Sequence, residues 1–139
     1  MSATEATPAI ATPPPAALDW ERGQGLLPAI VQDADNGRVL MLGYMNQAAL
    51  AQTLASGLVT FWSRSRGKLW TKGESSGNLL ELQGITPDCD GDALVLRVEQ
   101  VGGAACHTGK RNCFFRRIDR GRVEDVGRQV FDPAEVYKK

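Results

Sequence analysis

Residues 27–57 read LPAIVQDADNGRVLMLGYMNQAALAQTLASG and contain the signals that decide the fold. Two apolar runs, residues 27–33 and 39–44, lie on either side of the pair Asn36-Gly37. Asn-Gly readily adopts the positive φ angles of a tight turn, so the two runs are predicted to pair as antiparallel strands. The core is therefore expected to begin with a β-hairpin.

A helix is predicted directly after this hairpin. Asn46 is suited to cap its first turn, and Leu50 and Leu54 recur at helical spacing on the side that would be buried. Gly57 follows Ser56 at the position where helices commonly end in a left-handed residue. We therefore expect one helix that runs from Asn46 to about Ser56.

Alternating apolar and polar side chains predict further strands at residues 59–64, 79–85 and 93–101. A last strand is expected at about residues 113–118, and a short helix is expected after Pro133. The pattern does not alternate strands with helices in the way that builds a parallel sheet. The predicted class is α+β, with a mostly antiparallel sheet and one or two short helices.

The composition is that of one domain with polar ends. The 139 residues have a formal net charge of zero, so neither nucleic acid nor a membrane is expected as a partner. We expect residues 1–17, rich in Ala and Pro, to be a disordered tail, residues 18–120 to form the domain, and residues 121–139 to form a polar extension. Trp20 is expected to dock on the core.

The location expected from the sequence is the cytoplasm. No run of apolar residues is long enough to cross a membrane, and the N-terminus lacks the pattern of a signal peptide. The chain has three cysteines, an odd number, which suits a reducing compartment. The cysteines are therefore expected to be free thiols or metal ligands.

Three carboxylates, Asp88, Asp90 and Asp92, alternate along the chain, and Gly91 allows a sharp bend between them. Carboxylates this close repel one another unless a cation lies between them, and oxygen-only ligands suit Mg²⁺ or Ca²⁺. A solvated acidic turn between two strands accounts for the pattern equally well. An EF-hand does not, because a strand rather than a helix is predicted after the turn.

The three cysteines, Cys89, Cys106 and Cys113, form a second candidate metal site. Their spacing matches no zinc finger, but three thiolates leave one zinc position open, as catalytic zinc requires. Water bound to such a zinc ionises near neutral pH and becomes a nucleophile. His107, the only histidine, is a candidate general acid or base, or a fourth ligand. Three buried structural thiols are the alternative.

A basic and aromatic stretch, residues 62–77, reads WSRSRGKLWTKGESSG. Guanidinium groups bind phosphate, and tryptophan rings stack on heterocyclic bases. We therefore predict a metal-dependent hydrolase of a phosphorylated, nucleotide-like molecule, with a solvated basic turn as the alternative. The candidate substrate-binding residues are Trp62, Arg64, Arg66, Trp70, Lys72, Glu74, Ser75, Ser76, Lys110 and Arg111.

Three blocks of the chain resemble the phosphoribosyl-AMP cyclohydrolases of histidine biosynthesis: FWSRSRGKLWTKGESSGN, DCDGDALVLRVEQ and ACHTGKRNCFF. The similarity runs from about Gly25 to Arg117. It implies hydrolytic opening of the adenine ring of 1-(5-phosphoribosyl)-AMP, between N1 and C6, to give the phosphoribosyl-formimino-AICAR phosphate product. Because only a short stretch follows Arg117, a fused pyrophosphohydrolase domain is not expected.

The same resemblance implies metals and roles for individual residues. It implies that Mg²⁺ is held by the three aspartates and assists substrate binding. It also implies one zinc per subunit on the three cysteines, with Cys89 coming from the neighbouring subunit of a homodimer whose active sites are shared. A water activated by this zinc would attack the ring, and His107 would act as the acid or base.

Two other functions fit parts of the pattern. A small nucleotide- or nucleic-acid-binding module with a structural zinc site would bind its ligand without turnover. A hydrolytic deaminase of bases or nucleosides would need an H-x-E sequence together with P-C-x-x-C, and neither occurs in this chain. The cyclohydrolase is therefore the leading hypothesis.

Overall fold

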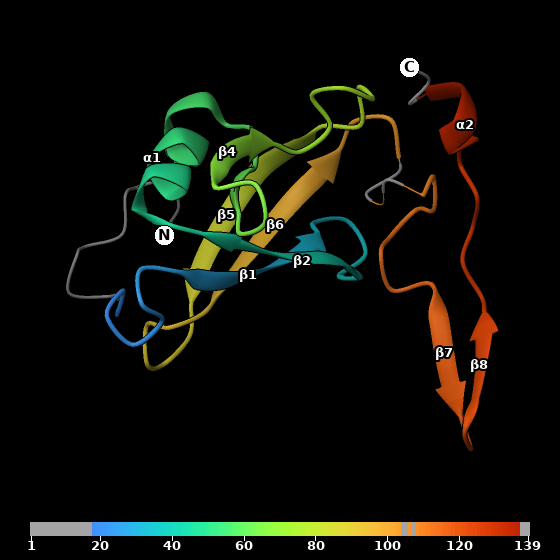
Figure 1. Ribbon diagram of the computed structural model, residues 1–139, viewed down its shortest axis with the longest axis horizontal. Helices are drawn as coiled ribbons and strands as arrows, with labels where there is room; N and C mark the ends of the chain where they lie inside the picture. Colours follow the sequence, from blue (N-terminus) through green and yellow to red (C-terminus); the bar gives the residue numbers. More distant parts are fainter. Residues whose placement is uncertain (1–17, 104–105, 107, 137–139) are drawn as a thin grey trace.

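The structure is a computed structural model, and it describes residues 18–103, 106 and 108–136. The expected tail at residues 1–17 and the candidate His107 lie outside the described residues. Figure 1 shows a body of strands with a helix against it and a C-terminal arm that projects from the body. Within the described ranges, no helix is long and apolar enough to cross a membrane.

A four-stranded sheet forms the centre of the body, in the order β2-β1-β6-β5. Its strands are β1 (Leu27–Asp33), β2 (Val39–Met45), β5 (Leu80–Pro87) and β6 (Leu94–Gln100), and all four are predicted by the sequence. The expectation of a mostly antiparallel sheet is confirmed, with one parallel pair between the central strands β1 and β6. A parallel pair needs a long connection, which the chain from β2 to β5 provides.

The turn between β1 and β2 differs from the predicted tight hairpin. Gly37 has a φ of 76°, but Asn36 is not among the described non-glycine residues with a positive φ. The Gly37 N–H donates to the Asp33 carbonyl oxygen at 2.9 Å, across a longer loop. Asn36 acts through its side-chain oxygen, which accepts a hydrogen bond from the Arg38 N–H at 2.9 Å. The antiparallel pairing of the two strands is as predicted.

Helix α1 (Gln47–Ser56) has the ends that the sequence predicts. The Asn46 side chain accepts a hydrogen bond from the first turn at 2.8 Å, and Gly57 closes the helix with a φ of 78°. Leu50 is buried as expected, whereas Leu54 is partly buried against the core. Local capping chemistry is therefore sufficient to set both ends of this helix.

A second, two-stranded sheet is made of β3 (Thr60–Ser63) and β4 (Lys68–Thr71), which pair as an antiparallel hairpin. Strand β3 falls within the predicted residues 59–64, but β4 is not predicted, because the sequence analysis treats its residues as part of a basic loop. Thr60 is buried, as are its neighbours Val59 and Phe61, so this strand does not show simple alternation. The Thr60 N–H donates to the Thr53 hydroxyl at 2.9 Å, which ties the strand to α1.

The core lies between the four-stranded sheet and the layer formed by α1 with β3 and β4 (Figure 1). Alternate side chains of β1 and β6 are buried, as expected for strands with one covered face. Trp20, in the lead-in to β1, packs against this core as predicted. The largest buried side chains are Phe61, Leu27, Leu40, Met45, Leu80, Leu94 and Leu96.

The arm, residues 114–136, contains β7 (Arg116–Asp119), β8 (Arg122–Asp125) and the short helix α2 (Pro133–Val136) expected after Pro133. Strand β7 pairs only with β8 among the described strands, so the strand predicted at residues 113–118 is shifted toward the C-terminus. Arg120 and Gly121 both have positive φ, as a two-residue hairpin turn requires. The expected boundary between residues 120 and 121 falls inside this turn.

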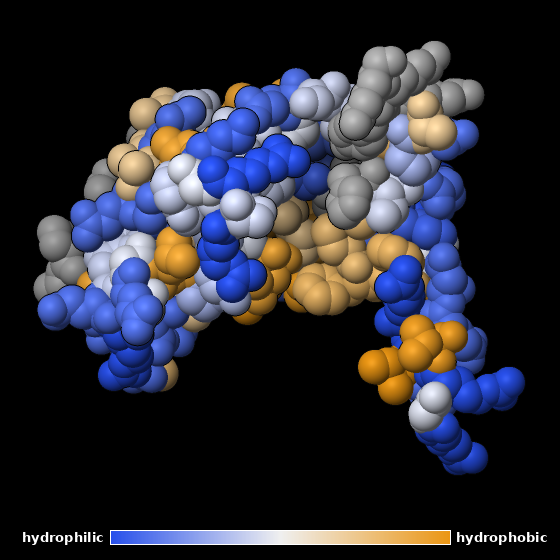
Figure 2. Space-filling view, in the orientation of Figure 1, coloured by the Kyte–Doolittle hydropathy of each residue, from blue (hydrophilic) through white to orange (hydrophobic). Residues whose placement is uncertain are grey.

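The two-stranded hairpin of the arm is open to solvent on all sides. Every residue of β7 and β8 is exposed. Figure 2 shows a small apolar group on the arm among charged side chains, and Ile118 and Val123 are 77% and 62% exposed. An isolated two-stranded hairpin is at best marginally stable in water, so the arm depends on its attachment to the body.

Candidate functional site

The largest concentration of predicted substrate-binding residues lies around one cavity of about 520 Å³, here called the main cavity. Its walls come from β2, from the β3–β4 hairpin, from the loop after β4 and from Cys113. The predicted residues Arg66, Trp70, Lys72, Glu74, Ser75 and Ser76 all line it. The lining residues that the sequence analysis did not select are Met41, Ser63, Ser65, Thr71 and Gly73.

The loop after β4 is tightly curled, and this places its polar groups at the main cavity. Gly73 and Gly77 have φ angles of 83° and 81°, and the Gly77 N–H donates to the Gly73 carbonyl oxygen at 2.8 Å. A Cβ on Gly73 would lie 2.2 Å from the carbonyl oxygen of Asn78. Glycine is therefore required at Gly73, both for the backbone conformation and for the close approach of the chain.

Trp62 and Arg64 lie in a neighbouring hollow of about 630 Å³. The Arg64 guanidinium stacks over the Tyr44 ring, with 3.9 Å from its carbon to the ring centroid. Ser63, Ser65 and Trp70 line both hollows, so the two are adjacent. The basic and aromatic stretch therefore supplies two adjacent surfaces.

Two of the three predicted zinc ligands meet beside the main cavity. Cys106 is buried and Cys113 is half-buried, and the Cys106 thiol forms a hydrogen bond with the Cys113 thiol. Burial first, and then the neighbouring Cys106, raise the pKa of the Cys113 thiol to about 12. The Cys113 N–H donates to the Leu40 carbonyl oxygen at 2.6 Å, which attaches this segment to β2. Adjacent thiols held at the end of a cavity fit a zinc site, since a bound Zn²⁺ reverses such a pKa shift.

Lys72 is the charged residue that links the cavity to the thiols. It is 6% exposed, lines the cavity and interacts electrostatically with both Cys106 and Cys113. Burial lowers the pKa of its ammonium group, while the two cysteines act in the opposite direction. A buried ammonium that faces a cavity is stabilised by any anion that enters it.

Cys89 does not join the other two cysteines within one chain. It is exposed in the aspartate loop, residues 88–92, which connects β5 to β6. Cys106 and residues 108–113, here called the thiol loop, follow the opposite end of β6 (Figure 1). A strand of seven residues such as β6 spans roughly 20 Å, which is far longer than any zinc–sulfur bond.

The aspartate loop gathers its three carboxylates. Ligand oxygens of Asp88, Asp90 and Asp92 all lie within 4.8 Å of one another. Desolvation alone would raise the pKa of the Asp88 carboxyl, but hydrogen bonds from the Asp92, Gly91 and Asp90 residues lower it overall. The Asp92 N–H, for example, donates to Asp88 Oδ1 at 3.0 Å. Three carboxylates that converge in this way offer the oxygen ligands that a hard divalent cation such as Mg²⁺ prefers.

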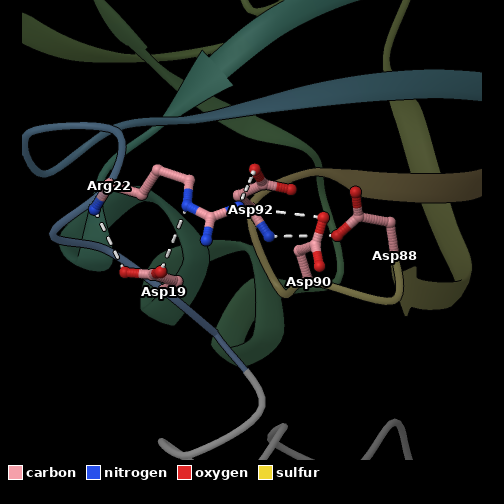
Figure 3. Close-up of polar contacts among 5 residues, drawn as sticks. All are labelled: Asp19, Arg22, Asp88, Asp90 and Asp92. Atoms are coloured by element: carbon pink, nitrogen blue, oxygen red, sulfur yellow. Dashed lines mark hydrogen bonds and ion pairs between the residues drawn. The ribbon is translucent and has the colours of Figure 1, made fainter.

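Arg22, which the sequence analysis did not select, extends to this loop from the lead-in (Figure 3). Its Nη1 lies 3.3 Å from Asp92 Oδ2 and 3.7 Å from Asp90 Oδ2, and its Nε lies 3.5 Å from Asp19 Oδ2. The hydrogen bond with Asp92 is the largest cause that raises the pKa of the guanidinium, and the negative charges of Asp92, Asp19 and Asp90 raise it further. A single arginine among polar residues carries no sequence signal that would have identified it.

Lys110 and Arg111 do not line either hollow. Lys110 Nζ lies 3.0 Å from Asp125 Oδ2 on the arm, and its side chain is only 15% exposed. The Arg111 N–H donates to the Arg128 carbonyl oxygen at 2.9 Å, and its buried Nε has no hydrogen-bond partner among the residues that the structure describes. These two residues therefore connect the thiol loop to the arm, and their predicted contacts with phosphate stay a prediction.

Comparison with known proteins agrees with the resemblance noted in the sequence. Residues 41–115 match the family model for phosphoribosyl-AMP cyclohydrolase. The chain is 55% identical over 122 residues to the phosphoribosyl-AMP cyclohydrolase of Desulfatibacillum aliphaticivorans, covering 88% of this chain and 98% of that protein. It is 59% identical over 114 residues to that of Methanothrix thermoacetophila, covering 82% and 91%. By both measures, the chain belongs to the phosphoribosyl-AMP cyclohydrolase family.

Proposed function

We propose that this protein hydrolyses phosphoribosyl-AMP by opening its adenine ring between N1 and C6, as a cytoplasmic step of L-histidine biosynthesis. The observation that carries the proposal is the main cavity, where Arg66, Trp70 and Lys72 line a space that also reaches Cys113. Relatives more than half identical to this chain are named for that reaction. A cavity with cations, an aromatic ring and a thiol suits an anionic purine nucleotide and a nearby metal.

The chemistry of the substrate matches the polar groups around the cavity. A ribosyl group on N1 makes the purine ring cationic and its C6 electrophilic, so a water can add there and the N1–C6 bond can break. Trp70 offers a face on which the ring can stack, and Arg66 offers a fork of donors to a phosphate. Ser75 and Ser76 add hydroxyl donors at the same wall.

Zinc is proposed to be held by Cys106 and Cys113, with Cys89 as the third ligand. When bound, the ion would supply a water that ionises near neutral pH. The buried Cys106 thiol, the half-buried Cys113 thiol and Lys72 support this assignment, because together they make a site that can stabilise thiolates next to the cavity. His107, outside the described residues, is proposed as the acid or base that moves a proton to or from the reacting ring.

Mg²⁺ is proposed to bind the aspartate loop and to assist substrate binding. The convergence of Asp88, Asp90 and Asp92 within one short loop supports this. The ion would add positive charge at a site where the chain itself presents mostly carboxylates, and phosphate oxygens are common further ligands of protein-bound Mg²⁺.

A homodimer with shared active sites is proposed because one chain cannot complete the thiolate site. Cys89 lies at one end of β6, and Cys106 and Cys113 lie beyond the other end. A second copy related by a two-fold axis would bring its Cys89 to the thiol loop of the first copy. The Cys89 of the first copy would in the same way reach the thiol loop of the second, which gives two equal sites. The proposal predicts that a Cys89 lesion and a Cys106 lesion can complement each other when they lie on different chains.

The test is to co-express Cys89→Ser and Cys106→Ser chains with different tags and to purify the mixed species. Each variant alone should be inactive. Each mixed dimer has one intact site of two, so the purified mixed dimers should regain about half of the wild-type activity. The matched control pairs Cys106→Ser with Cys113→Ser, which damages both sites of the mixed dimer and should regain nothing. Mixed dimers of the first pair that stay inactive would contradict a shared site.

The reaction itself is tested by adding phosphoribosyl-AMP to the zinc-loaded protein and following the purine absorbance. We expect an absorbance change that depends on enzyme concentration and that stops when zinc is chelated. Tight binding of the nucleotide without any change in absorbance would instead indicate a binding module.

A further inference from the structure

The guanidinium of Arg22 lies where a cation for the aspartate loop would be expected. Its Nη1 is shared between Asp92 Oδ2 at 3.3 Å and Asp90 Oδ2 at 3.7 Å. Both oxygens belong to carboxylates whose ligand atoms converge within 4.8 Å. Figure 3 shows the side chain reaching across from Asp19 to these two aspartates.

The backbone around Arg22 is held against the aspartate loop, so only its side chain is free to leave. The Asp19 N–H donates to the Gly91 carbonyl oxygen at 2.7 Å, which joins the lead-in to the loop directly. Leu18 is buried and Trp20 packs against the core on the same segment. The Gly25 N–H donates to the Trp20 carbonyl oxygen at 2.7 Å and closes the lead-in as a compact turn.

We propose that Arg22 is a built-in counter-ion that competes with the divalent cation for Asp90 and Asp92. This inference rests on the proposed Mg²⁺ site. Binding of the ion would displace Nη1 from both carboxylates, while Asp19 keeps its contact with Nε at 3.5 Å. The lead-in would stay docked, because none of its anchors involves the Arg22 side chain.

Competition follows from charge and from the number of available oxygens. Mg²⁺ takes carboxylate oxygens at about 2.1 Å and demands near-octahedral geometry, which leaves little room for a guanidinium on the same oxygens. A fixed positive charge beside the ion also lowers the affinity for it. Without an ion, the same guanidinium reduces repulsion among three carboxylates, so Arg22 stabilises the loop in its empty state.

The size of the effect should be modest, because the ion pairs are open to solvent. The Arg22 side chain is 57% exposed, and those of Asp90 and Asp92 are 59% and 28% exposed. Exposed ion pairs contribute little individually, so their combined removal should tighten ion binding by roughly threefold to thirtyfold.

The experiment measures Mn²⁺ binding to the zinc-loaded full chain by the electron paramagnetic resonance of the free ion. Mn²⁺ prefers the same oxygen ligands as Mg²⁺. Arg22→Gln should bind Mn²⁺ on the order of tenfold more tightly than the wild type, and Arg22→Lys, which keeps a charge but loses the fork of donors, should fall between them. Arg38→Gln, at an exposed arginine in the β1–β2 turn, should leave the affinity unchanged.

Asp90→Asn identifies the site that is being titrated. If this variant loses a Mn²⁺ site that the wild type has, while Arg22→Gln binds with equal or weaker affinity than the wild type, the competition proposal is overturned. Weaker binding would mean that Arg22 orients the carboxylates for the ion. If neither the wild type nor Arg22→Gln has a Mn²⁺ site that is lost in Asp90→Asn, the proposed metal site is wrong. The competition proposal, which rests on that site, is then wrong as well.

Discussion

The aspartate loop and the thiol loop occupy opposite ends of β6, and they differ in how much of a metal site one chain provides. The aspartate loop is exposed and brings its three carboxylates together by itself. The thiol loop is tucked beside the main cavity and brings together only two thiols of the described chain. In the proposed assignment, the first loop draws its metal ligands from one chain, and the second takes a third ligand from a partner chain.

This difference suggests different tasks for the two loops. Carboxylates on an open loop can exchange an ion with solvent and with Arg22, at little cost to the fold. Buried thiols next to Lys72 are tied to the core through the Cys113 N–H and Leu40. A metal held there would be enclosed by the cavity wall, which is where a reactive water must be protected and positioned.

The largest expected effect is on the thiol loop. Cys106→Ser removes a ligand from the proposed zinc site, which already takes one of its ligands from the partner chain. We therefore expect loss of bound zinc and a fall in kcat/KM of at least about a thousandfold. Metal analysis and the absorbance assay measure both. Mn²⁺ binding to the aspartate loop should survive in this variant. A zinc-free Cys106→Ser protein with full turnover would contradict the proposed role of the thiols.

The corresponding substitution at the aspartate loop should have a smaller effect than the substitution at the thiol loop. Asp90→Asn removes one charged oxygen ligand of three, and we expect Mn²⁺ affinity to fall on the order of a hundredfold. Zinc content should stay at the wild-type level, because the zinc ligands are other residues. Measuring both metals in both variants compares the two loops directly. Loss of zinc in Asp90→Asn would show that the two sites are not independent.

The sequence predicts the local features of the molecule well. Asn46 and Gly57 set the ends of α1, and the three aspartates meet because they are near neighbours in one turn. Strands β5 and β6 of the main sheet follow from alternation of apolar residues, and β1 and β2 follow from apolar runs on either side of a turn. These features depend on residues within a few positions of one another, which is the range that a pattern can describe.

Features that depend on distant segments are the ones that the sequence leaves out. The parallel pairing of β1 with β6 and the electrostatic interaction of Lys72 with the thiols both join residues far apart in the chain. Arg22 reaches the aspartate loop only because the lead-in docks on Gly91. The Arg120-Gly121 turn is local, but it lies in a polar stretch without the apolar alternation that would mark the strands on either side of it.

Lys72 provides a test of the main cavity, which lies beside the thiol loop. Lys72→Met removes a buried cation that a substrate phosphate would neutralise, so we expect KM for phosphoribosyl-AMP to rise by roughly tenfold to a hundredfold, with zinc retained. Lys68→Met is the matched control, because Lys68 is exposed on the same hairpin and does not line the cavity. Equal effects of the two substitutions on KM would argue against a specific contact at Lys72.

The smallest effect concerns the tie between the thiol loop and the arm. A hydrogen bond from the Gly127 N–H first, and then one from Lys110, lower the pKa of the Asp125 carboxyl below 3.8. The stabilisation from this group is therefore present above its unfolded pKa and is lost as pH falls through the lower folded value. Asp125→Asn should lower the Tm by about 1–2 °C at neutral pH, and the difference from the wild type should shrink below pH 3.8.

Asp119→Asn, an exposed position on β7 of the same arm, serves as the control for this last change. It changes the net charge of the arm by the same amount as Asp125→Asn does. It leaves the ion pair between Lys110 and Asp125 in place, with Nζ and Oδ2 3.0 Å apart. A decrease in Tm that is the same for both variants, or that persists unchanged in acid, would mean that net charge rather than the Lys110–Asp125 pair is responsible. Because the aspartate loop has no contact with the arm among the described ion pairs, its Mn²⁺ affinity should be the same in both variants. A change in that affinity would indicate that the arm communicates with both ends of β6.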